Sequence, residues 1–315
     1  MNPYYDNNFF QFFVTLGSRL IDLLSGKEIS MSSDELQLLT IMLIAISASG
    51  IGVFLVLRRM TMLTNAISHT ILAGVVLAYF AHRWLGIMDE PFDFSHLLPS
   101  ETVLLVAALI MAFLTVFLTE LLITQLKLRE DISCGIVFTF LFSLGVIALT
   151  VLSRNAHIGP ELLMGNADAL HVDDLILQCR VTLFNLFVLF FLFRGFSFTT
   201  FDPIYSKVLG LSPALLGYLL MAQVAVTSIA SFRAVGVLLV LGFFVGPPLI
   251  ARQCTHRLVP LFFVALLVAI ITSCVGVALS RHLVSVFSLP ISTSALVVCV
   301  IALTYVVVLL APRRA

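Results

Sequence analysis

The segment TNAISHTILAGVVLAY, residues 64–79, is a largely apolar run of membrane length that carries a histidine. A helix that spans the hydrocarbon core of a bilayer needs about 20 mostly apolar residues. Asn65 lies four residues before His69, so on a helix the amide and the imidazole share one face. An ionisable side chain inside a membrane span is costly and indicates a functional role. A histidine that is hydrogen-bonded to a neighbouring helix for packing is the alternative, and these residues alone leave both open.

The composition of the whole chain is typical of a membrane protein. Of its 315 residues, 60% are hydrophobic and only 11% are charged, whereas soluble domains carry roughly 25% charged residues. The 17 basic and 17 acidic residues balance, so the net charge gives no indication of nucleic-acid binding. The five cysteines show no CxxC or Cys/His spacing and are expected to be small packing residues. We predict an all-α, polytopic helical membrane protein.

About nine segments are long and apolar enough to span the membrane. They are Leu38–Leu57, Leu63–Ala81, Thr102–Leu122, Ser133–Leu152, Cys179–Phe193, Ala214–Ser231, Ala234–Ala251, Pro260–Leu279 and Ser292–Leu310. The apolar stretch 214–251 is too long for one span, so we expect it to fold back near residues 231–233. Basic residues recur in alternate loops and in the C-terminal tail, whereas the opposite loops are acidic or mixed. This pattern predicts an external N-terminus and a cytoplasmic C-terminus.

Residues 1–37 precede the first predicted span. Apolar residues recur there at three- and four-residue steps, at Phe9, Phe12, Phe13, Leu16 and Leu20. This spacing is typical of an amphipathic helix, and charged residues interrupt it too often for a span. We therefore expect an extracytoplasmic amphipathic segment over 1–37 that packs against the bundle, with the membrane surface or a partner as alternatives. A transmembrane domain follows over 38–315.

One predicted cytoplasmic loop, about residues 198–213, contains signals for a short helix. Asp202 suits the N-cap and Pro203 the first helical position. Gly210 is a suitable stop, so two helical turns are predicted between them, ending at Leu209. A short amphipathic helix in a loop between spans can dock into a groove on a partner. A well-capped surface connector is the alternative.

The segment RAVGVLLVLGFFVGPPLIAR, residues 233–252, combines glycines with a pair of prolines. The glycines allow close backbone approach between helices. The prolines remove two backbone donors, so the helix is predicted to bend or break there, as helices do along substrate paths in many transporters. A helix that simply ends at Gly246 is the alternative. The hinge candidates are Arg233, Gly236, Gly246, Pro247 and Pro248.

The sequence contains no pattern that indicates enzymatic chemistry. It has no GxxxxGK[ST] phosphate-binding loop and no HExxH pattern, and no paired carboxylates lie in a predicted span. We therefore expect no catalytic residues and no ATP hydrolysis on this chain. A gradient-driven secondary cation transporter is the alternative class, but it would normally need membrane-embedded carboxylates. Glu120, near a cytoplasmic helix end, is the one candidate for that role.

Several stretches together resemble the membrane subunit of the metal-type ATP-binding cassette importers, which bring zinc, manganese or iron into bacteria. They are RRMTMLTNAISHTILAGVVLAY, REDISCGIVFTFLFSLGVIAL, LLMGNADALHVDDL, FDPIYSKVLGL and RAVGVLLVLGFFVGPPLIAR, followed by the terminal APRRA. The resemblance implies a type II importer permease, similar in fold to the vitamin B12 importer, in the bacterial cytoplasmic (inner) membrane. It also implies a second permease subunit, two cytoplasmic ATPase subunits and an extracytoplasmic metal-binding protein.

The resemblance assigns roles to two groups of residues. His69 matches the family's path-lining histidine, whereas Asn65 stands where the family has an aspartate. The second group matches the coupling helix that docks into the ATPase. Its members are Asp202, Pro203, Tyr205, Lys207 and Gly210.

These matches and departures define an expected mechanism. ATP-driven closure of the ATPases would push on the coupling helix and produce alternating access, with the metal as a transient substrate and no cofactor held stably. The family's Leu-Pro-Gly is Leu72-Ala73-Gly74 here, and a family aspartate before the last span is Ser288. A neutral amide at Asn65 compensates a divalent cation less well than a carboxylate. We therefore favour a second, non-identical permease subunit that keeps the aspartate, with a pair of identical subunits as the alternative.

Overall fold

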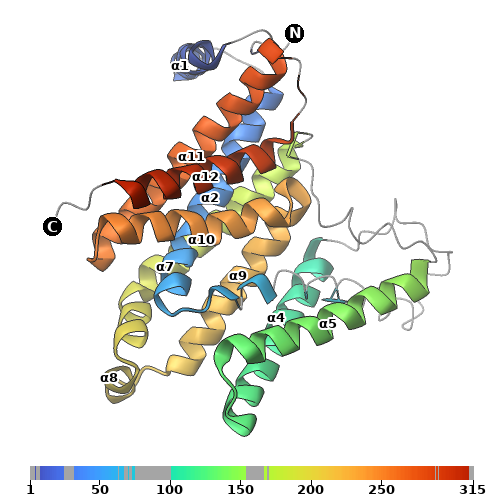
Figure 1. Cartoon of the computed structure of the whole chain (residues 1–315), viewed down its shortest axis with the longest axis vertical. Helices are drawn as coiled ribbons and strands as arrows, with labels where there is room; N and C mark the ends of the chain where they lie inside the picture. The colour runs from blue at the N-terminus through green and yellow to red at the C-terminus, as the bar shows by residue number, and fades with distance from the viewer. Residues whose placement is uncertain are drawn as a thin grey trace. The chain divides into compact units, whose positions relative to one another are not determined.

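The computed structural model describes residue 4 and residues 8–24, 32–62, 64–66, 70, 73–74, 101–153, 167–168, 170–287, 289 and 291–311. Within these residues the chain forms helices and no strand. The helices are α1 (Phe9–Leu24), α2 (Ser33–Leu57), α4 (Glu101–Leu126), α5 (Glu130–Ser153), α7 (Val172–Phe201), α8 (Pro203–Val208), α9 (Pro213–Val235), α10 (Val237–Cys254), α11 (Leu258–Phe287) and α12 (Thr293–Leu310), shown in Figure 1.

The chain divides into two compact units. The first unit comprises Met1–Val53, Gly165–Phe184 and Ala234–Ala315, and the second comprises Phe54–Met164 and Asn185–Arg233. The first unit therefore holds α1, most of α2, the start of α7 and the helices α10 to α12. The second holds α4, α5, the rest of α7, α8 and most of α9.

Seven helices among the described residues are long and apolar enough to cross a membrane. They lie in α2, α4, α7, α9, α10, α11 and α12. Helix α5 contains a shorter apolar stretch, Ile132–Ala148, and most of the predicted span Leu63–Ala81 lies outside the described residues. The predicted fold class, a polytopic helical membrane protein, is confirmed, whereas the count of nine spans stays a prediction.

Helix α7 is longer than the sequence pattern indicates. The predicted span covers Cys179–Phe193, but the helix runs from Val172 to Phe201. Asp173 and Asp174 occupy its first turn, where carboxylates are favoured by the helix dipole. A hydropathy window ends at such charges, whereas the backbone hydrogen bonds of the helix continue through them.

The predicted fold-back near residues 231–233 is displaced. Helix α9 continues through this segment to Val235, and α10 begins at Val237. The residue between them is Gly236, with a φ of +83°. A side chain would be strained at this φ, so glycine is the residue that allows the interruption. Ser231 and Phe232 are buried, so these residues belong to a packed helix and Arg233 does not end it.

Helix α10 continues through the proline pair to Cys254. The predictions that the helix breaks at the prolines or ends at Gly246 are therefore wrong. Pro248 has no N–H to donate to the carbonyl of Phe244, four residues earlier. That carbonyl faces Gly52 of α2, because a Cβ built on Gly52 would lie 2.1 Å from the Phe244 oxygen. The absence of a side chain on Gly52 lets α2 approach this carbonyl closely.

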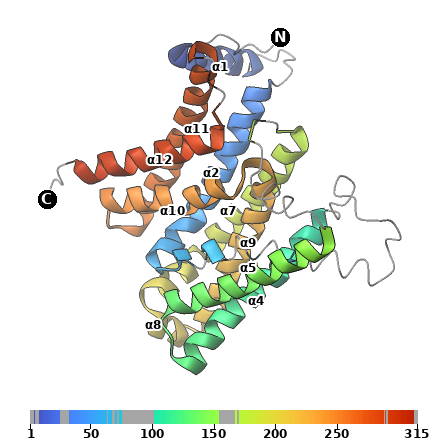
Figure 2. The same ribbon diagram turned by 45° about the vertical axis from the view of Figure 1, so that its right-hand side comes forward.

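Helices α10, α11 and α12 pack on one another in the first unit, as Figures 1 and 2 show. A Cβ on Gly246 of α10 would lie 2.3 Å from Cγ2 of Ile301 of α12. A Cβ on Gly276 of α11 would lie 2.5 Å from Cγ2 of Val297, also on α12. Glycines on two helices therefore provide room for the branched side chains of the third.

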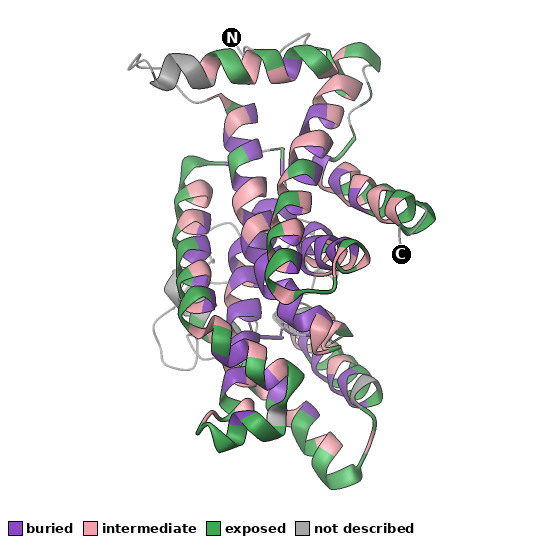
Figure 3. Cartoon of the chain, turned by 90° about the vertical axis from the view of Figure 1, so that its left-hand side faces the viewer, coloured by how far each residue is buried: buried purple, intermediate pink, exposed green. Residues whose placement is uncertain are grey.

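The helices differ strongly in burial, and Figure 3 shows the contrast between buried and exposed helical faces. In the most apolar part of α2, 78% of the residues are buried, against 28% in α11 and 22% in α12. Along α11 the exposed residues include Phe263, Leu267 and Ile271. A row of large apolar side chains on the outside of a helix is typical of a surface that faces lipid. The burial therefore identifies α2 as an internal helix.

In the second unit, α4 and α5 lie side by side (Figures 1 and 2). Met111 of α4 and Val137 and Leu141 of α5 form a buried apolar cluster with Ala73. Phe54, at the end of α2, contacts two aromatic rings of α7, one edge-on and one tilted, with ring centroids 5.6 Å and 5.4 Å away. Apolar packing between helices thus holds this unit together.

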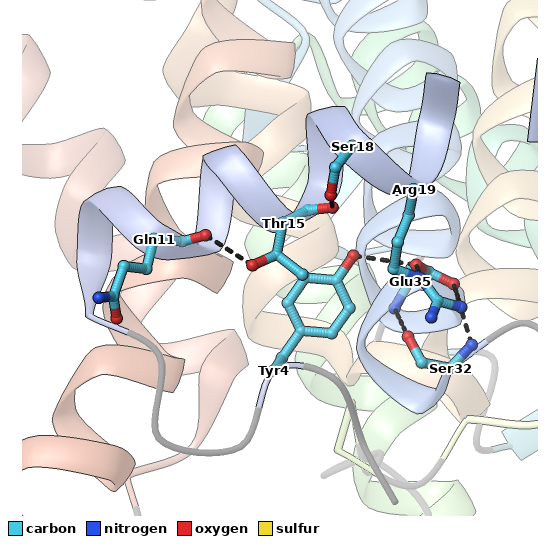
Figure 4. Close-up of polar contacts among 7 residues, drawn as sticks. All are labelled: Tyr4, Gln11, Thr15, Ser18, Arg19, Ser32 and Glu35. Atoms are coloured by element: carbon cyan, nitrogen blue, oxygen red, sulfur yellow. Dashed lines mark hydrogen bonds and ion pairs between the residues drawn. The ribbon is translucent and has the colours of Figure 1, made fainter. Parts of the chain in front are cut away.

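The first turn of α2 binds α1, as Figure 4 shows. Ser32 and Glu35 form a reciprocal capping box, in which the Ser32 amide donates to Glu35 Oε2 at 3.0 Å and the Glu35 amide donates to Ser32 Oγ at 3.4 Å. The Glu35 carboxylate also pairs with Arg19 of α1 and accepts from the Tyr4 hydroxyl at 2.9 Å. Burial, together with this carboxylate, raises the pKa of Tyr4, so its hydroxyl stays a donor.

A second ion pair joins the same turn to α11. The buried Asp34 pairs with Arg281, so adjacent carboxylates of α2 bind different elements of the first unit. The amphipathic helix predicted within residues 1–37 is confirmed as α1, whose Phe12 is buried. Its extracytoplasmic location stays a prediction.

Gly52→Ala tests the close approach of α2 to α10. The added methyl group overlaps a backbone oxygen, so the helices must separate, and overpacking of this kind costs about 1–3 kcal/mol of stability. The thermal unfolding midpoint of the purified protein should fall. Gly17→Ala is the control, because a Cβ at Gly17 meets no atom within 4 Å. Equal midpoints for the two variants would contradict the packing described here.

Candidate functional site: a predicted path segment and a capped loop helix

The segment that carries the predicted path residues belongs to the second unit. Asn65 is helical and half-buried, between the buried Thr64 and Ala66. His69, the predicted metal-contacting histidine, lies outside the described residues. The pairing of Asn65 with His69 on one face therefore stays a prediction.

Thr70, Ala73 and Gly74, which follow His69 in the sequence, are held against α4 and α5. The hydroxyl oxygens of Thr70 and Thr115 of α4 lie 3.0 Å apart, and both side chains are buried. A Cβ on Gly145 of α5 would lie 2.9 Å from Ala73. A Cβ on Gly74 would lie 2.6 Å from Cγ of Met111. These contacts hold Thr70, Ala73 and Gly74 against α4 and α5, so small residues here serve packing.

Helix α8 forms where the sequence predicts a short capped helix, between Asp202 and Gly210. The carboxylate of Asp202 accepts from the Tyr205 amide at 2.9 Å and forms the N-cap, and Pro203 is the first helical residue. At the other end the Gly210 amide donates to the Lys207 carbonyl at 3.0 Å, and the Leu211 amide donates to the Ser206 carbonyl at 2.9 Å. These two bonds form a Schellman motif, for which Gly210 has the required φ of +76°.

The outer surface of α8 is apolar. The side chains of Ile204 and Val208, one turn apart, are 80% and 79% exposed. Tyr205 and Leu209 form a second exposed pair, and Lys207 is exposed beside them, whereas Ser206 is buried. A six-residue helix that is capped at both ends and presents apolar residues outward is suited to contact a protein partner.

Arg58 supports the end of α7 that leads into α8. Its Nε donates to Thr200 Oγ1 at 3.0 Å, its guanidinium also binds Thr199, and it lies 6.0 Å from the centre of the Phe196 ring. By its sequence position Arg58 is only one of the basic residues that recur in alternate loops. An arginine directly after an apolar span, together with adjacent threonines before a capped loop helix, was the available signal.

The hinge candidates lie in different places along α9 and α10. Arg233 is in the last turn of α9, and Gly236 separates the two helices. Gly246, Pro247 and Pro248 lie inside α10 of the first unit. Gly236 therefore interrupts the helical backbone, whereas Gly246, Pro247 and Pro248 shape the packing of the continuous helix α10.

A group of polar residues that the sequence did not single out lies inside the second unit. Asn185 of α7 donates through Nδ2 to Oγ1 of Thr227 on α9 at 2.7 Å. Gln223 donates to the Asn185 carbonyl at 3.3 Å, and its Oε1 is buried with no hydrogen-bond partner among the described residues. The four-residue spacing of Gln223 and Thr227 in an apolar helix was the signal for a buried polar stripe.

A second polar group lines a cavity of about 440 Å³ in the first unit. Asp168 Oδ1 accepts from Gln37 Nε2 at 2.8 Å and from Thr293 Oγ1 at 2.6 Å. Thr293 also lies 2.8 Å from Ser280 Oγ. These bonds join the turn before α7 to α2, α11 and α12. Within the described ranges, no three His, Cys, Asp or Glu side chains gather closely enough to hold a metal ion.

Comparisons with known proteins agree on one family. The model of a family described as "ABC 3 transport family" matches residues 35–311. A "probable metal transport system membrane protein" of Chlamydia muridarum is 36% identical over 97% of this chain and 93% of its own length. The "manganese transport system membrane protein MntD" of Bacillus subtilis is 30% identical over 78% of this chain and 83% of its own length. Other relatives are named for zinc and iron transport.

Solved structures give the same fold. The structure titled "PsaBC from Streptococcus pneumoniae in complex with Fab" matches with a TM-score of 0.72 at 22% identity. The match covers 94% of this chain and 96% of that chain. At this level of identity the likeness establishes the fold.

Asp202→Ala tests the N-cap of α8. Loss of an N-cap carboxylate costs about 1 kcal/mol, so the short helix should open more often and its backbone amides should exchange faster with deuterium. Asp202→Asn is the matched control, because asparagine also caps helices well. Equal amide exchange in the two variants would show that this cap does not hold α8.

Proposed function

The chain belongs to the ABC 3 transport family, and from this membership we propose that it is the membrane-spanning permease subunit of an ATP-driven importer of divalent metal ions. The permease is not itself catalytic. Manganese, zinc and iron are the substrates named for its relatives, and we extend that group of metals to this chain. The observation that carries the proposal is the doubly capped, outwardly apolar helix α8 in a membrane protein of this family.

Helix α8 is proposed as the element that docks into a separate cytoplasmic ATPase. A docking element must keep its shape when unloaded, which the caps of α8 provide, and it must offer apolar surface, which Ile204 and Val208 provide. Tyr205 and Lys207 add a polar edge that can fix the orientation of the partner. ATP-driven closure of the ATPases would move α8, and the permease would respond by alternating access.

The proposed location is the bacterial cytoplasmic membrane, with the N-terminus outside and the C-terminus inside. This orientation places Arg58, Arg59 and the α8 loop in the cytoplasm, in agreement with the bias of basic residues. The partners that this arrangement requires are a second permease subunit, cytoplasmic ATPases and an extracytoplasmic protein that delivers the metal.

The transported metal is proposed to contact Asn65 and His69 only in passing. Imidazole nitrogen suits zinc and iron, whereas an amide carbonyl oxygen suits manganese and adds a dipole without a charge. A neutral residue at position 65 weakens the hold on a dication, which favours release. We infer that a non-identical second permease subunit supplies the carboxylate that this chain lacks, and that no cofactor is held stably here.

Variants at position 204 test the coupling role of α8. Ile204→Ser removes exposed apolar surface and should lower ATP-driven metal uptake about tenfold, equivalent to about 1.4 kcal/mol of docking energy. The measurement is radiometal uptake into vesicles that contain the co-expressed complex. Ile204→Val is the control, because it keeps an apolar side chain and should keep uptake.

Two results would contradict this proposal. Full uptake in the Ile204→Ser variant would remove α8 from the coupling surface. Uptake that needs no ATP and stops when the proton gradient is collapsed would identify the chain as a secondary transporter.

Variants at positions 65 and 69 test the metal path. His69→Ala should lower uptake strongly, and His69→Gln should lower it equally because glutamine keeps a polar side chain but lacks the imidazole ligand. Asn65→Asp should lower the KM for the metal and slow turnover, because the added charge holds the dication more tightly. Uptake restored by His69→Gln would assign His69 to packing instead.

A further inference from the structure

Helix α1 has a protein-facing side that the contacts define clearly. Phe12 is 1% exposed, and Phe9, Phe13 and Leu16 beside it are partly buried. Arg19 and Tyr4 attach the helix to Glu35 at the start of α2. The helix also packs against α11. These contacts fix how α1 is rotated about its own axis within the first unit.

The exposed side of α1 divides into an apolar and a polar flank. Phe10 and Val14, one turn apart, are 80% and 72% exposed. Gln11 and Ser18 are also exposed. At about 100° per residue, the Phe10–Val14 pair and the Gln11–Ser18 pair point about 70° apart. Figure 4 shows Gln11, Thr15 and Ser18 along one side of the helix, where both hydroxyls bond to backbone carbonyls at 2.9 Å.

The position of α1 places it where membrane helices end. It is adjacent to the first turn of the membrane helix α2 and to the C-terminal end of α11, and Figures 1, 2 and 3 agree on this placement within the first unit. The end of α11 carries further exposed apolar residues, Val284, Val286 and Phe287. Exposed apolar side chains therefore lie at the end of α11 that adjoins α1.

We propose that α1 is an interfacial helix whose Phe10–Val14 flank contacts membrane lipid at the boundary between headgroups and acyl chains. The Gln11–Ser18 flank faces water, and the Phe12 side faces the protein. A lipid surface fits all three sides, because a helix at this boundary must present apolar, polar and packed sides at once. The exposed apolar side chains at the adjoining end of the membrane helix α11, Val286 and Phe287, favour lipid over a protein partner as the occupant.

Tryptophan fluorescence in reconstituted vesicles tests this inference. The chain has a single tryptophan, Trp84, so Trp84→Phe provides a dark background. Phe10→Trp and Gln11→Trp are then compared in the full-length protein, in phosphatidylcholine vesicles with lipids brominated near the headgroup. Both substituted side chains are exposed, so neither change disturbs the core. Val14→Trp is a second reporter on the apolar flank.

We expect brominated lipid to quench Phe10→Trp and Val14→Trp about twofold or more beyond Gln11→Trp, because the apolar flank is immersed in the interface. Aqueous iodide should quench in the opposite order. Strong iodide quenching at position 10 without quenching by brominated lipid would overturn the proposal and identify a water-facing or partner-facing flank. Equal lipid quenching at positions 10 and 11 would also overturn it.

Discussion

The contact on which the first unit depends is the approach of Gly52 to the carbonyl of Phe244. Inside a membrane an unsatisfied backbone carbonyl costs several kcal/mol. Pro248 removes the donor that would normally satisfy this carbonyl, and the lack of a side chain at Gly52 allows α2 to lie directly against it. The internal helix α2 and the proline-containing helix α10 are therefore fitted to each other at the level of the backbone.

The sequence predicted elements well where local chemistry decides the structure. The N-cap Asp202, the first-turn Pro203 and the stop Gly210 defined α8 because caps act within a few residues. The periodicity of the N-terminal aromatic residues likewise predicted α1. Both signals depend on neighbours along the chain and need no knowledge of the tertiary packing.

The sequence predicted less well where tertiary contacts decide the structure. The fold-back was expected near residues 231–233, but Ser231 is buried in a packed helix and the helical backbone is interrupted at Gly236. The prolines of α10 were expected to bend or break the helix. The sequence did not reveal that Gly52, in a segment about 200 residues away, packs against the carbonyl that Pro248 leaves without its usual donor. Arg58 was missed as a support for α7 for the same reason. The proposed contact between Asn65, His69 and the metal rests on the sequence.

The connections of α8 to its two neighbours differ in stiffness. Helix α7 ends at Phe201 and α8 begins at Pro203, and the amide of the single residue between them donates to the Phe198 carbonyl at 2.8 Å. On the other side, four residues that include the glycine stop separate Val208 from Pro213. A displacement of α8 is therefore transmitted to α7 with little slack and is absorbed before it reaches α9. The connection from α7 to α8 is therefore the stiffer side of this loop, and Arg58 lies where that connection meets the membrane helices.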